Sequence, residues 1–223
     1  MTGIVAVTGA AGALGRKTVE VLGQAGWKIV GIDLADVPAD AVALALGGVD
    51  LGDEQAMLDA ATRIEAELGG LDGLVNIAGG FRWETVADGD VATWDKLYAM
   101  NVRTALIATR ALMPMLRKSG GAIVNIGAAA SSKAGAGMGA YAASKAGVAR
   151  LTEALAEELK DEGVRVNALL PSIIDTPANR ADMPDADFDR WVTPEQLANV
   201  VGFLLSPGAS AVTGALVPVT GRV

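Results

Sequence analysis

A doubly wound α/β domain with a seven-stranded, mostly parallel sheet is the fold class that this sequence predicts. Short apolar runs alternate with longer helical patterns from one end of the chain to the other. Strands that are separated by helices form βαβ units and therefore a parallel sheet. The strand candidates are continuously apolar, which indicates a sheet with helices on both faces. We expect one domain over residues 1–223, because the chain is long enough for one sizeable core and shows neither a linker nor a repeat.

Glycine, proline and polar cap residues divide the chain into its elements. Gly163 is placed to end a long helix. Thr193 followed by Pro194 is an N-cap residue with proline at the first helical position, which begins the last helix. The expected strands are Ile4–Thr8, Lys28–Asp33, Ala45–Asp50, Gly73–Asn76, Ala122–Ile126, Val164–Leu170 and Ala215–Val219, and the expected helices cover residues 13–25, 53–68, 91–117, 138–162 and 194–205.

The segment from Pro171 to Thr193 is irregular. It contains three prolines and, between Asp182 and Asp189, four aspartates, so a surface loop is expected. The segment also follows the carboxyl end of a predicted strand, which is where open parallel sheets bind ligands. A lid over a substrate is therefore the alternative.

Composition excludes several classes of function. A formal net charge of −8 and a pI near 4.6 argue against nucleic-acid binding, which needs a basic surface. The chain has no cysteine and no histidine, so neither thiolate chemistry nor a metal site is expected. The apolar stretch between Lys118 and Lys133 is too short and too rich in glycine to span a membrane, and no basic leader precedes the first apolar run. We expect a cytoplasmic protein without nucleic-acid or membrane partners.

A glycine-rich turn, TGAAGALG over residues 8–15, lies between the first predicted strand and the first predicted helix. Glycine allows a pyrophosphate to approach the backbone, and the helix N-terminus supplies unpaired N–H groups and a favourable dipole. At this place in a βαβ unit the pattern predicts a dinucleotide site. A tight packing turn without a ligand is the alternative.

Asp33 ends the second predicted strand, about twenty residues beyond the glycine turn. A carboxylate there can accept hydrogen bonds from the ribose hydroxyls of adenosine and would repel a 2′-phosphate. The next residues are Leu34 and Ala35 rather than a basic side chain. NAD(H) is therefore favoured over NADP(H), with a solvated aspartate at a strand end as the alternative.

Tyr141 and Lys145 lie four residues apart on one face of the helix expected over 138–162. An ammonium beside a phenol favours the phenolate, and moving a tyrosine pKa from about 10 towards 7 takes about 4 kcal/mol of differential stabilisation. Such a phenol is suited to reducing a carbonyl or oxidising an alcohol. The same spacing also occurs in solvated pairs, so the assignment depends on the rest of the chain.

In this order, the glycine turn, the strand-end aspartate and the YxxxK helix resemble the short-chain dehydrogenase/reductase family over essentially the whole chain. The resemblance implies a Rossmann-like fold and a nicotinamide cofactor. It implies that Tyr141 is the catalytic acid and base, that Lys145 binds the nicotinamide ribose, and that Asn101 holds a proton-relay water. The residues that it assigns to the cofactor are Gly9, Gly12, Ala13, Leu14, Gly15, Asp33, Asp50, Leu51, Asn76, Ala78, Gly79, Lys145, Pro171 and Thr176.

The chain departs from the family pattern at several positions. Ile77 and Ser172 stand where the family usually has asparagine and glycine, and Ala128 stands where it usually has a serine that hydrogen-bonds the reacting oxygen. Ser132 is expected either to replace that serine or to be a plain loop residue. Losing such a donor typically costs about 2.7–4 kcal/mol of transition-state stabilisation. The site should therefore be poor at reducing unactivated ketones.

Within the family, three stretches are similar to the dihydropteridine reductases, which also lack this serine. They are residues 78–83, residues 137–141 and, above all, the stretch from Asp175 to Trp191. Quinonoid dihydropterins are electron-poor, so hydride can reach them with little polarisation of an oxygen. Phe81 and Trp83 would then stack on a flat ring beside Ala128, with core packing as the alternative.

The sequence thus predicts an NAD(P)H-dependent oxidoreductase that transfers hydride between nicotinamide and a small carbonyl, alcohol or C=N compound. A quinonoid dihydropteridine reductase is the narrower alternative. The alternative from another functional class is a sensor that binds NAD(H) without catalysis. The reason to consider it is Ala128, which stands where the family has its serine. By resemblance to the family, a homodimer or homotetramer is expected to associate through the helices over 91–117 and 138–162.

Overall fold

The computed structural model describes residues 3–223 and contains one parallel sheet. Its strands are β1 (Ile4–Thr8), β2 (Lys28–Ile32), β3 (Leu44–Leu46), β4 (Gly73–Asn76), β5 (Ala122–Ile126), β6 (Arg165–Pro171) and β7 (Leu216–Val219). The seven strands follow the order β3-β2-β1-β4-β5-β6-β7, and every neighbouring pair is parallel. The predicted doubly wound, Rossmann-like fold is confirmed. The order reverses between β1 and β4, and ligands bind at such a switch point in open sheets of this kind.

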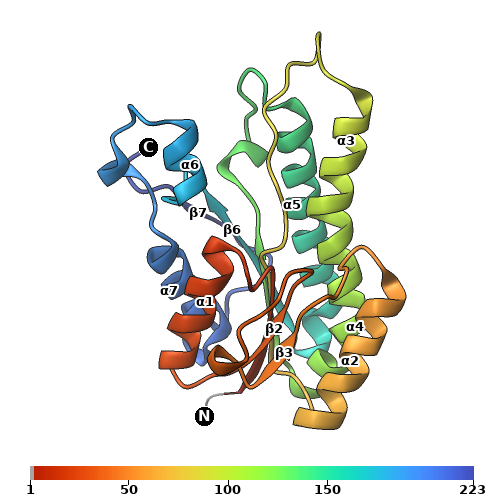
Figure 1. Cartoon of the computed structure of the whole chain (residues 1–223). Coiled ribbons are helices and arrows are strands. Elements are labelled where there is room, and N and C mark those ends of the chain that lie inside the picture. The colour runs from red at the N-terminus through yellow and green to blue at the C-terminus, as the bar shows by residue number, and fades with distance from the viewer. Residues whose placement is uncertain (1–2) are drawn as a thin grey trace.

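Helices cover both faces of the sheet. They are α1 (Ala13–Gln24), α2 (Glu54–Leu68), α3 (Val91–Tyr98), α4 (Thr104–Ser119), α5 (Gly139–Leu159), α6 (Pro177–Asp182) and α7 (Pro194–Leu205). Figure 1 shows α1 and α7 on one side of the sheet and α2, α4 and α5 on the other. Two apolar cores result, one beneath each helical layer. Within residues 3–223, no helix has both the length and the apolar character needed to cross a lipid bilayer.

The ends of the helices agree with the expected cap residues. Thr193 and Gln196 form a capping box at the start of α7, in which each side chain bonds the other residue's backbone N–H. The long helix α5 ends in a 3₁₀ turn over Lys160–Glu162, and Gly163 follows it with a φ of +76°. The start of α7 and the end of α5 are therefore both determined by local sequence.

Three elements differ from the expected ones. β3 is shorter than predicted, because Gly48 adopts a φ of +75° and turns the chain. The helix expected over 91–117 is divided into α3 and α4 by a π-helical turn, Ala99–Arg103. The segment expected to be a loop contains α6, which Thr176 caps and Pro177 begins.

Candidate active site

The glycine-rich turn after β1 brings separate segments of backbone into close contact. Gly9 has a φ of +69°, and a methyl group there would lie 2.8 Å from the Ala78 nitrogen. A methyl group at Gly15 would lie 2.0 Å from the Gly9 oxygen. The helix α1 begins at Ala13, and its N-cap residue Gly12 has no side chain to bond the amides of the first turn. The turn can therefore present backbone N–H groups and the positive end of a helix dipole to an anion.

We expect Gly15→Ala to lower the free energy of unfolding by about 1–3 kcal/mol, because its methyl group meets backbone that must shift. Gly23→Ala on the same helix is the matched control. A methyl group at Gly23 meets nothing within 4 Å, so this variant should gain about 0.5–1 kcal/mol from the better helix propensity of alanine. Denaturant unfolding of both variants tests the prediction, and equal stability of the two would contradict it.

Asp33 directly follows β2 and lies beside the glycine turn. Its Oδ2 accepts a hydrogen bond from the Ala11 N–H (2.9 Å), and its Oδ1 accepts one from the Ala35 N–H (2.9 Å). The half-buried carboxylate is therefore held in place by backbone from both segments. A fixed negative charge here suits hydroxyl donors and disfavours a phosphate group.

The residues assigned to the cofactor by resemblance differ in exposure. Leu14 and Leu51 are buried, one in each of the two cores. Asp50 is exposed, and its Oδ1 accepts a hydrogen bond from the Gly52 N–H (2.8 Å). Of these, only Asp50 presents a polar side chain at the surface of the domain.

Asn76 ends β4, and its side chain is bonded inside the domain. Its Nδ2 donates to Thr109 Oγ1 (3.1 Å) and to Asn125 Oδ1 (2.9 Å). Its Oδ1 is buried and lacks a hydrogen-bond partner among residues 3–223. The amide therefore joins β4 to α4 and β5, and the cofactor role of Asn76 stays a prediction.

Thr8 is a residue of the site that the sequence did not single out. Its Oγ1 accepts hydrogen bonds from the Ile77 N–H (3.2 Å) and the Ala78 N–H (3.4 Å). Thr8 is also fully buried at the end of β1. It holds the segment after β4 against the glycine turn, so the two strand ends at the switch point keep one arrangement. In the sequence, the one feature that could have indicated this role is the position of Thr8 directly before Gly9 of the glycine-rich turn.

The residues predicted for catalysis meet around Gly79, just beyond the end of β4. A methyl group at Gly79 would lie 2.4 Å from Asn101 Oδ1 and 3.5 Å from Lys145 Nζ. Lys145 Nζ donates a hydrogen bond to the Ile126 carbonyl oxygen (2.8 Å) at the end of β5. Tyr141 lies one helical turn before Lys145 on α5. Residues from three separate elements therefore converge at the carboxyl end of the sheet.

Asn101 lies within the π-helical turn between α3 and α4. Its Oδ1 accepts a hydrogen bond from the Gly80 N–H (2.9 Å), and its Nδ2 donates to the Gly80 oxygen (3.0 Å). The side chain thereby pairs with the backbone of the segment that follows β4. Turns of this kind occur frequently at functional sites.

The two aromatic candidates make different contacts. The rings of Phe81 and Tyr141 meet edge to face, with centroids 4.9 Å apart and planes at 88°. Phe81 is nevertheless 53% exposed. Trp83 is exposed as well, but its Nε1 donates to the Ala136 oxygen (3.0 Å), and its ring lies against Gly137. Phe81 therefore flanks the candidate catalytic tyrosine, whereas Trp83 packs on the loop before α5.

Burial shifts the pKa values of Tyr141 and Lys145, the two buried ionisable groups of α5, in opposite directions. It raises the pKa of Tyr141 to about 12 and lowers the pKa of Lys145 to about 8. The sequence predicted that the lysine would lower the tyrosine pKa, and the protein alone shows the reverse. Desolvation disfavours the charged form of each group, so it opposes both the phenolate and the ammonium that would stabilise it. A lowered tyrosine pKa therefore needs additional positive charge at the site.

Lys145→Met should remove a pH dependence of stability that the buried lysine causes. The lysine pKa falls from 10.5 in the unfolded chain to about 8 in the folded protein, so the unfolded state binds more protons between these values. The wild-type free energy of unfolding then rises with pH across this window, and the buried ammonium is destabilising below it. Relative to that of Lys145→Met, the wild-type melting temperature should therefore rise from pH 6 to pH 10. The exposed Lys118→Met is the control, and a constant gap for Lys145→Met would refute the argument.

Ala128 follows β5 in an extended conformation (φ −160°, ψ 152°) and is buried. Ser131 and Ser132 lie beyond it, in and directly after a 3₁₀ turn in which the Ser131 N–H bonds the Ala128 oxygen (3.0 Å). Ser132 is exposed to solvent. This exposure gives no support to Ser132 as a replacement for the family's serine.

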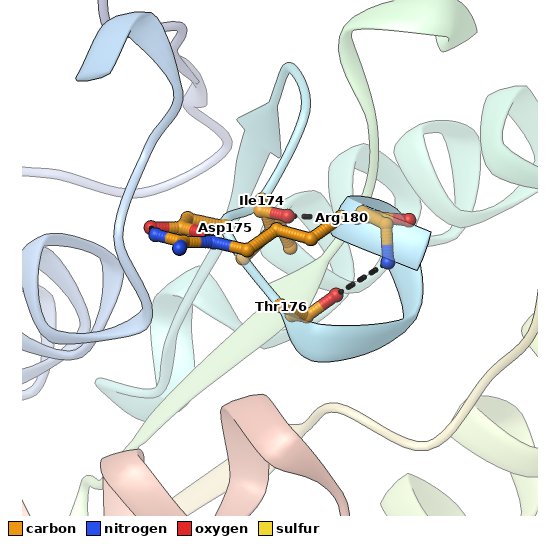
Figure 2. A network of polar contacts seen from close by, with 5 residues as sticks. Ile174, Asp175, Thr176 and Arg180 are labelled. Atoms are coloured by element: carbon orange, nitrogen blue, oxygen red, sulfur yellow. Dashed lines mark hydrogen bonds and ion pairs between the residues drawn. The ribbon is translucent and has the colours of Figure 1, made fainter. Parts of the chain in front are cut away.

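Pro171 ends β6, and the segment beyond it is ordered by its own contacts (Figure 2). Thr176 Oγ1 accepts a hydrogen bond from the Asn179 N–H (3.3 Å), which caps α6. The Asn179 side chain donates to the Ile174 oxygen (2.7 Å). The carboxamide contact that the resemblance assigns to Thr176 would therefore have to coexist with this cap.

Arg180 holds the same segment together through its planar guanidinium group. It forms a two-pronged ion pair with Asp175, at 2.5 and 2.7 Å, and lies over the ring of Phe188 at 4.7 Å. This pairing holds the pKa of Asp175 below its ordinary value. Figure 1 shows α6 beyond the carboxyl ends of the strands, across from the first turns of α5. The plain surface loop expected from the sequence is therefore replaced by a short helix, and the lid over a substrate stays a prediction.

Comparison with known proteins identifies the family of the chain. Residues 3–187 match the family model described as short chain dehydrogenase. The chain is 33% identical over 243 residues to protein FixR of Bradyrhizobium diazoefficiens, covering 98% of this chain and 85% of that protein. It is 32% identical over 242 residues to 2-(S)-hydroxypropyl-CoM dehydrogenase 3 of Xanthobacter autotrophicus, covering 98% and 95%.

The fold is also similar to that of solved structures. The 3-ketoacyl-(acyl-carrier-protein) reductase of Brucella melitensis, solved with NADH, superposes with a TM-score of 0.89. The identity is 27%, over 99% of this chain and 98% of that one. With the family model spanning most of the sequence, the chain belongs to the short-chain dehydrogenase/reductase family of oxidoreductases.

Proposed function

We propose that the protein is an NAD(H)-dependent oxidoreductase that transfers hydride between nicotinamide and a small carbonyl, alcohol or C=N compound. One observation carries the proposal: Lys145 and Asn101 converge on Gly79, with Tyr141 one turn away on α5. This convergence lies beside the switch point of the sheet, where open α/β sheets bind ligands.

The residues present fit a nicotinamide dinucleotide. Gly9 and Gly15 remove the side chains that would fill the turn after β1, and α1 begins with glycine at its N-cap. A diphosphate would lie at that turn, and the fixed Asp33 carboxylate would accept bonds from ribose hydroxyls. The same carboxylate supports NAD(H) over NADP(H). When bound, the nicotinamide supplies or accepts hydride, and its oxidised form carries positive charge.

The side chains have distinct parts in this scheme. During reduction, the Tyr141 hydroxyl gives its proton to the substrate oxygen or nitrogen as the adjoining carbon gains hydride. Lys145, already held by the Ile126 carbonyl, would bind the ribose and supply positive charge beside the phenol. Asn101 would anchor the water chain that returns a proton to Tyr141. Oxidation of an alcohol runs these transfers in reverse and needs the phenolate.

Two side chains favour an activated substrate. Ala128 offers no hydroxyl to the reacting oxygen, so the substrate must be reducible without that donor. Phe81 presents an exposed ring next to Tyr141, which suits a flat or apolar group. A quinonoid dihydropterin combines both properties, and it is the narrower candidate. A sensor that binds NAD(H) without turnover is the candidate from another class, favoured by Ala128 alone.

An assay of NADH oxidation tests these candidates against each other. The panel contains a quinonoid dihydropterin, a quinone, 2,3-butanedione and an unactivated ketone, with NADH binding measured separately by fluorescence. Turnover of the activated compounds over the unactivated ketone is expected. Preference for the dihydropterin alone would support the narrower candidate, and tight NADH binding with no turnover on any compound would support the sensor.

We also propose that the chain forms a homo-oligomer through the layer that contains α3 and α5. Val91, Trp94 and Tyr98 leave large apolar side chains exposed along α3. Exposed apolar surface of this kind is typical of association sites. Sedimentation analysis at several concentrations measures the state of assembly, and a monomer at every concentration would contradict this expectation.

A further inference from the structure

A buried hydroxyl connects two of the residues placed in the site above. Ser144 Oγ donates a hydrogen bond to the Tyr141 carbonyl oxygen (2.7 Å) and accepts one from Asn101 Nδ2 (2.9 Å). Ser144 is 3% exposed and Asn101 is 2% exposed. Ser144 also directly precedes Lys145 in the chain. The contact therefore joins the first turn of α5 to the π-helical turn between α3 and α4.

The hydrogen bonds around Asn101 leave its amide little freedom. One N–H of Nδ2 is used by Gly80 O and the other by Ser144 Oγ, while Oδ1 accepts from the Gly80 N–H. The Ser144 hydroxyl has a single proton, and the Tyr141 carbonyl takes it. Each donor thus has one partner, and three separate segments of backbone are held in one arrangement.

We propose that Ser144 is a positioning residue, which fixes the π-helical turn carrying Asn101 relative to Tyr141 and Lys145. The catalytic consequence of this inference rests on the proposed function. The hydrogen bond that holds the turn to α5 does not depend on it. Without the hydroxyl, a buried N–H of Asn101 loses its acceptor, and the turn over 99–103 loses this hydrogen bond to α5. A misplacement of about 1 Å near reacting groups can reduce turnover by about a hundredfold.

A second hydroxyl on the same helix provides a matched control. Thr152 Oγ1 donates to the Val148 oxygen (2.8 Å) and accepts from Asn125 Nδ2 (2.9 Å), and it is fully buried. Thr152 therefore makes the same two kinds of bond as Ser144. It lies about two helical turns after Ser144 on α5, away from Tyr141 and Lys145. Loss of the Thr152 hydroxyl should affect stability without releasing the turn at Asn101.

The experiment compares Ser144→Ala, Ser144→Thr and Thr152→Val with the wild-type protein. The first readout is hydrogen exchange of the amides in residues 99–103. We expect Ser144→Ala to exchange about tenfold faster there, the factor that loss of one buried hydrogen bond allows. Ser144→Thr, which keeps a hydroxyl, should restore protection, and Thr152→Val should leave these amides unchanged.

The second readout is NADH oxidation with 2,3-butanedione as the probe. Ser144→Ala should lower kcat by about ten- to a hundredfold with the KM for NADH unchanged, because a displaced acid affects the reaction more than cofactor binding. Thr152→Val should retain the wild-type kcat even if its melting temperature falls equally. Unchanged exchange at 99–103 in Ser144→Ala, or an equal effect from Thr152→Val, would overturn the proposal. If the wild type binds NADH but reduces no compound of the panel, the proposed function fails, and the exchange measurement still shows whether Ser144 holds the turn over 99–103.

Discussion

Tyr141→Phe will reduce turnover by about 10²–10⁴-fold, which is the usual contribution of a positioned proton donor. The substitution removes only the hydroxyl. The aromatic ring can keep its edge-to-face contact with Phe81, so the fold and the shape of the site should be retained. Binding of NADH should remain close to that of the wild type, because no proposed nucleotide contact involves the phenol.

Tyr98→Phe is the control for this variant. The chain has only two tyrosines, and Tyr98 is 55% exposed on α3. Its substitution should leave kcat unchanged. The measurement is kcat for NADH oxidation with an activated carbonyl probe, together with NADH affinity. A Tyr141→Phe protein that turns over at the wild-type rate would remove the tyrosine from the proposed mechanism.

Ala128→Ser will increase turnover of unactivated ketones, by up to about 10²–10³-fold if the new hydroxyl reaches the developing charge on oxygen. The residue is buried in extended backbone two residues after the end of β5, and serine adds a single oxygen to alanine. The effect should be much smaller for quinones, which need less polarisation of the reacting oxygen. The ratio of the two rates measures the added donor directly.

Ala129→Ser tests whether any added hydroxyl in this loop has the same effect. Ala129 is the next residue, half-buried in the 3₁₀ turn, and its substitution should leave the ratio unchanged. Melting temperatures identify a variant that is merely destabilised. If Ala128→Ser folds as well as the wild type and shows no gain on ketones, the alanine is not what limits this substrate class.

The sequence predicted the parts of the site that depend on local pattern. The glycine turn before α1, the aspartate after β2 and the Tyr141–Lys145 spacing each combine a residue type with a position in a βαβ unit. Such positions follow from strand and helix order alone. The doubly wound sheet follows in the same way, because strands separated by helices permit few other arrangements.

The parts that the sequence did not predict depend on contacts between distant segments. The apolar pattern over 91–117 is continuous, and the π-helical turn within it coincides with the bonds between Asn101 and Gly80. The direction of the Tyr141 pKa depends on burial, which a helical spacing does not reveal. For α6, the signal was present, since Thr176-Pro177 repeats the pattern of Thr193-Pro194. Its helix is one of only six residues, too short for an apolar period to show.

Residues 174–192 hold a defined conformation in the folded protein, and this affects the affinity of any ligand that binds beside them. Fixing one residue of a flexible chain costs about 1–2 kcal/mol in conformational entropy. Here the clip between Asp175 and Arg180, and the β-bridge between Ile174 and Val192, already restrict the backbone in the folded protein. A ligand that touches this segment therefore retains more of its contact energy as affinity, and its association need not wait for a loop to fold.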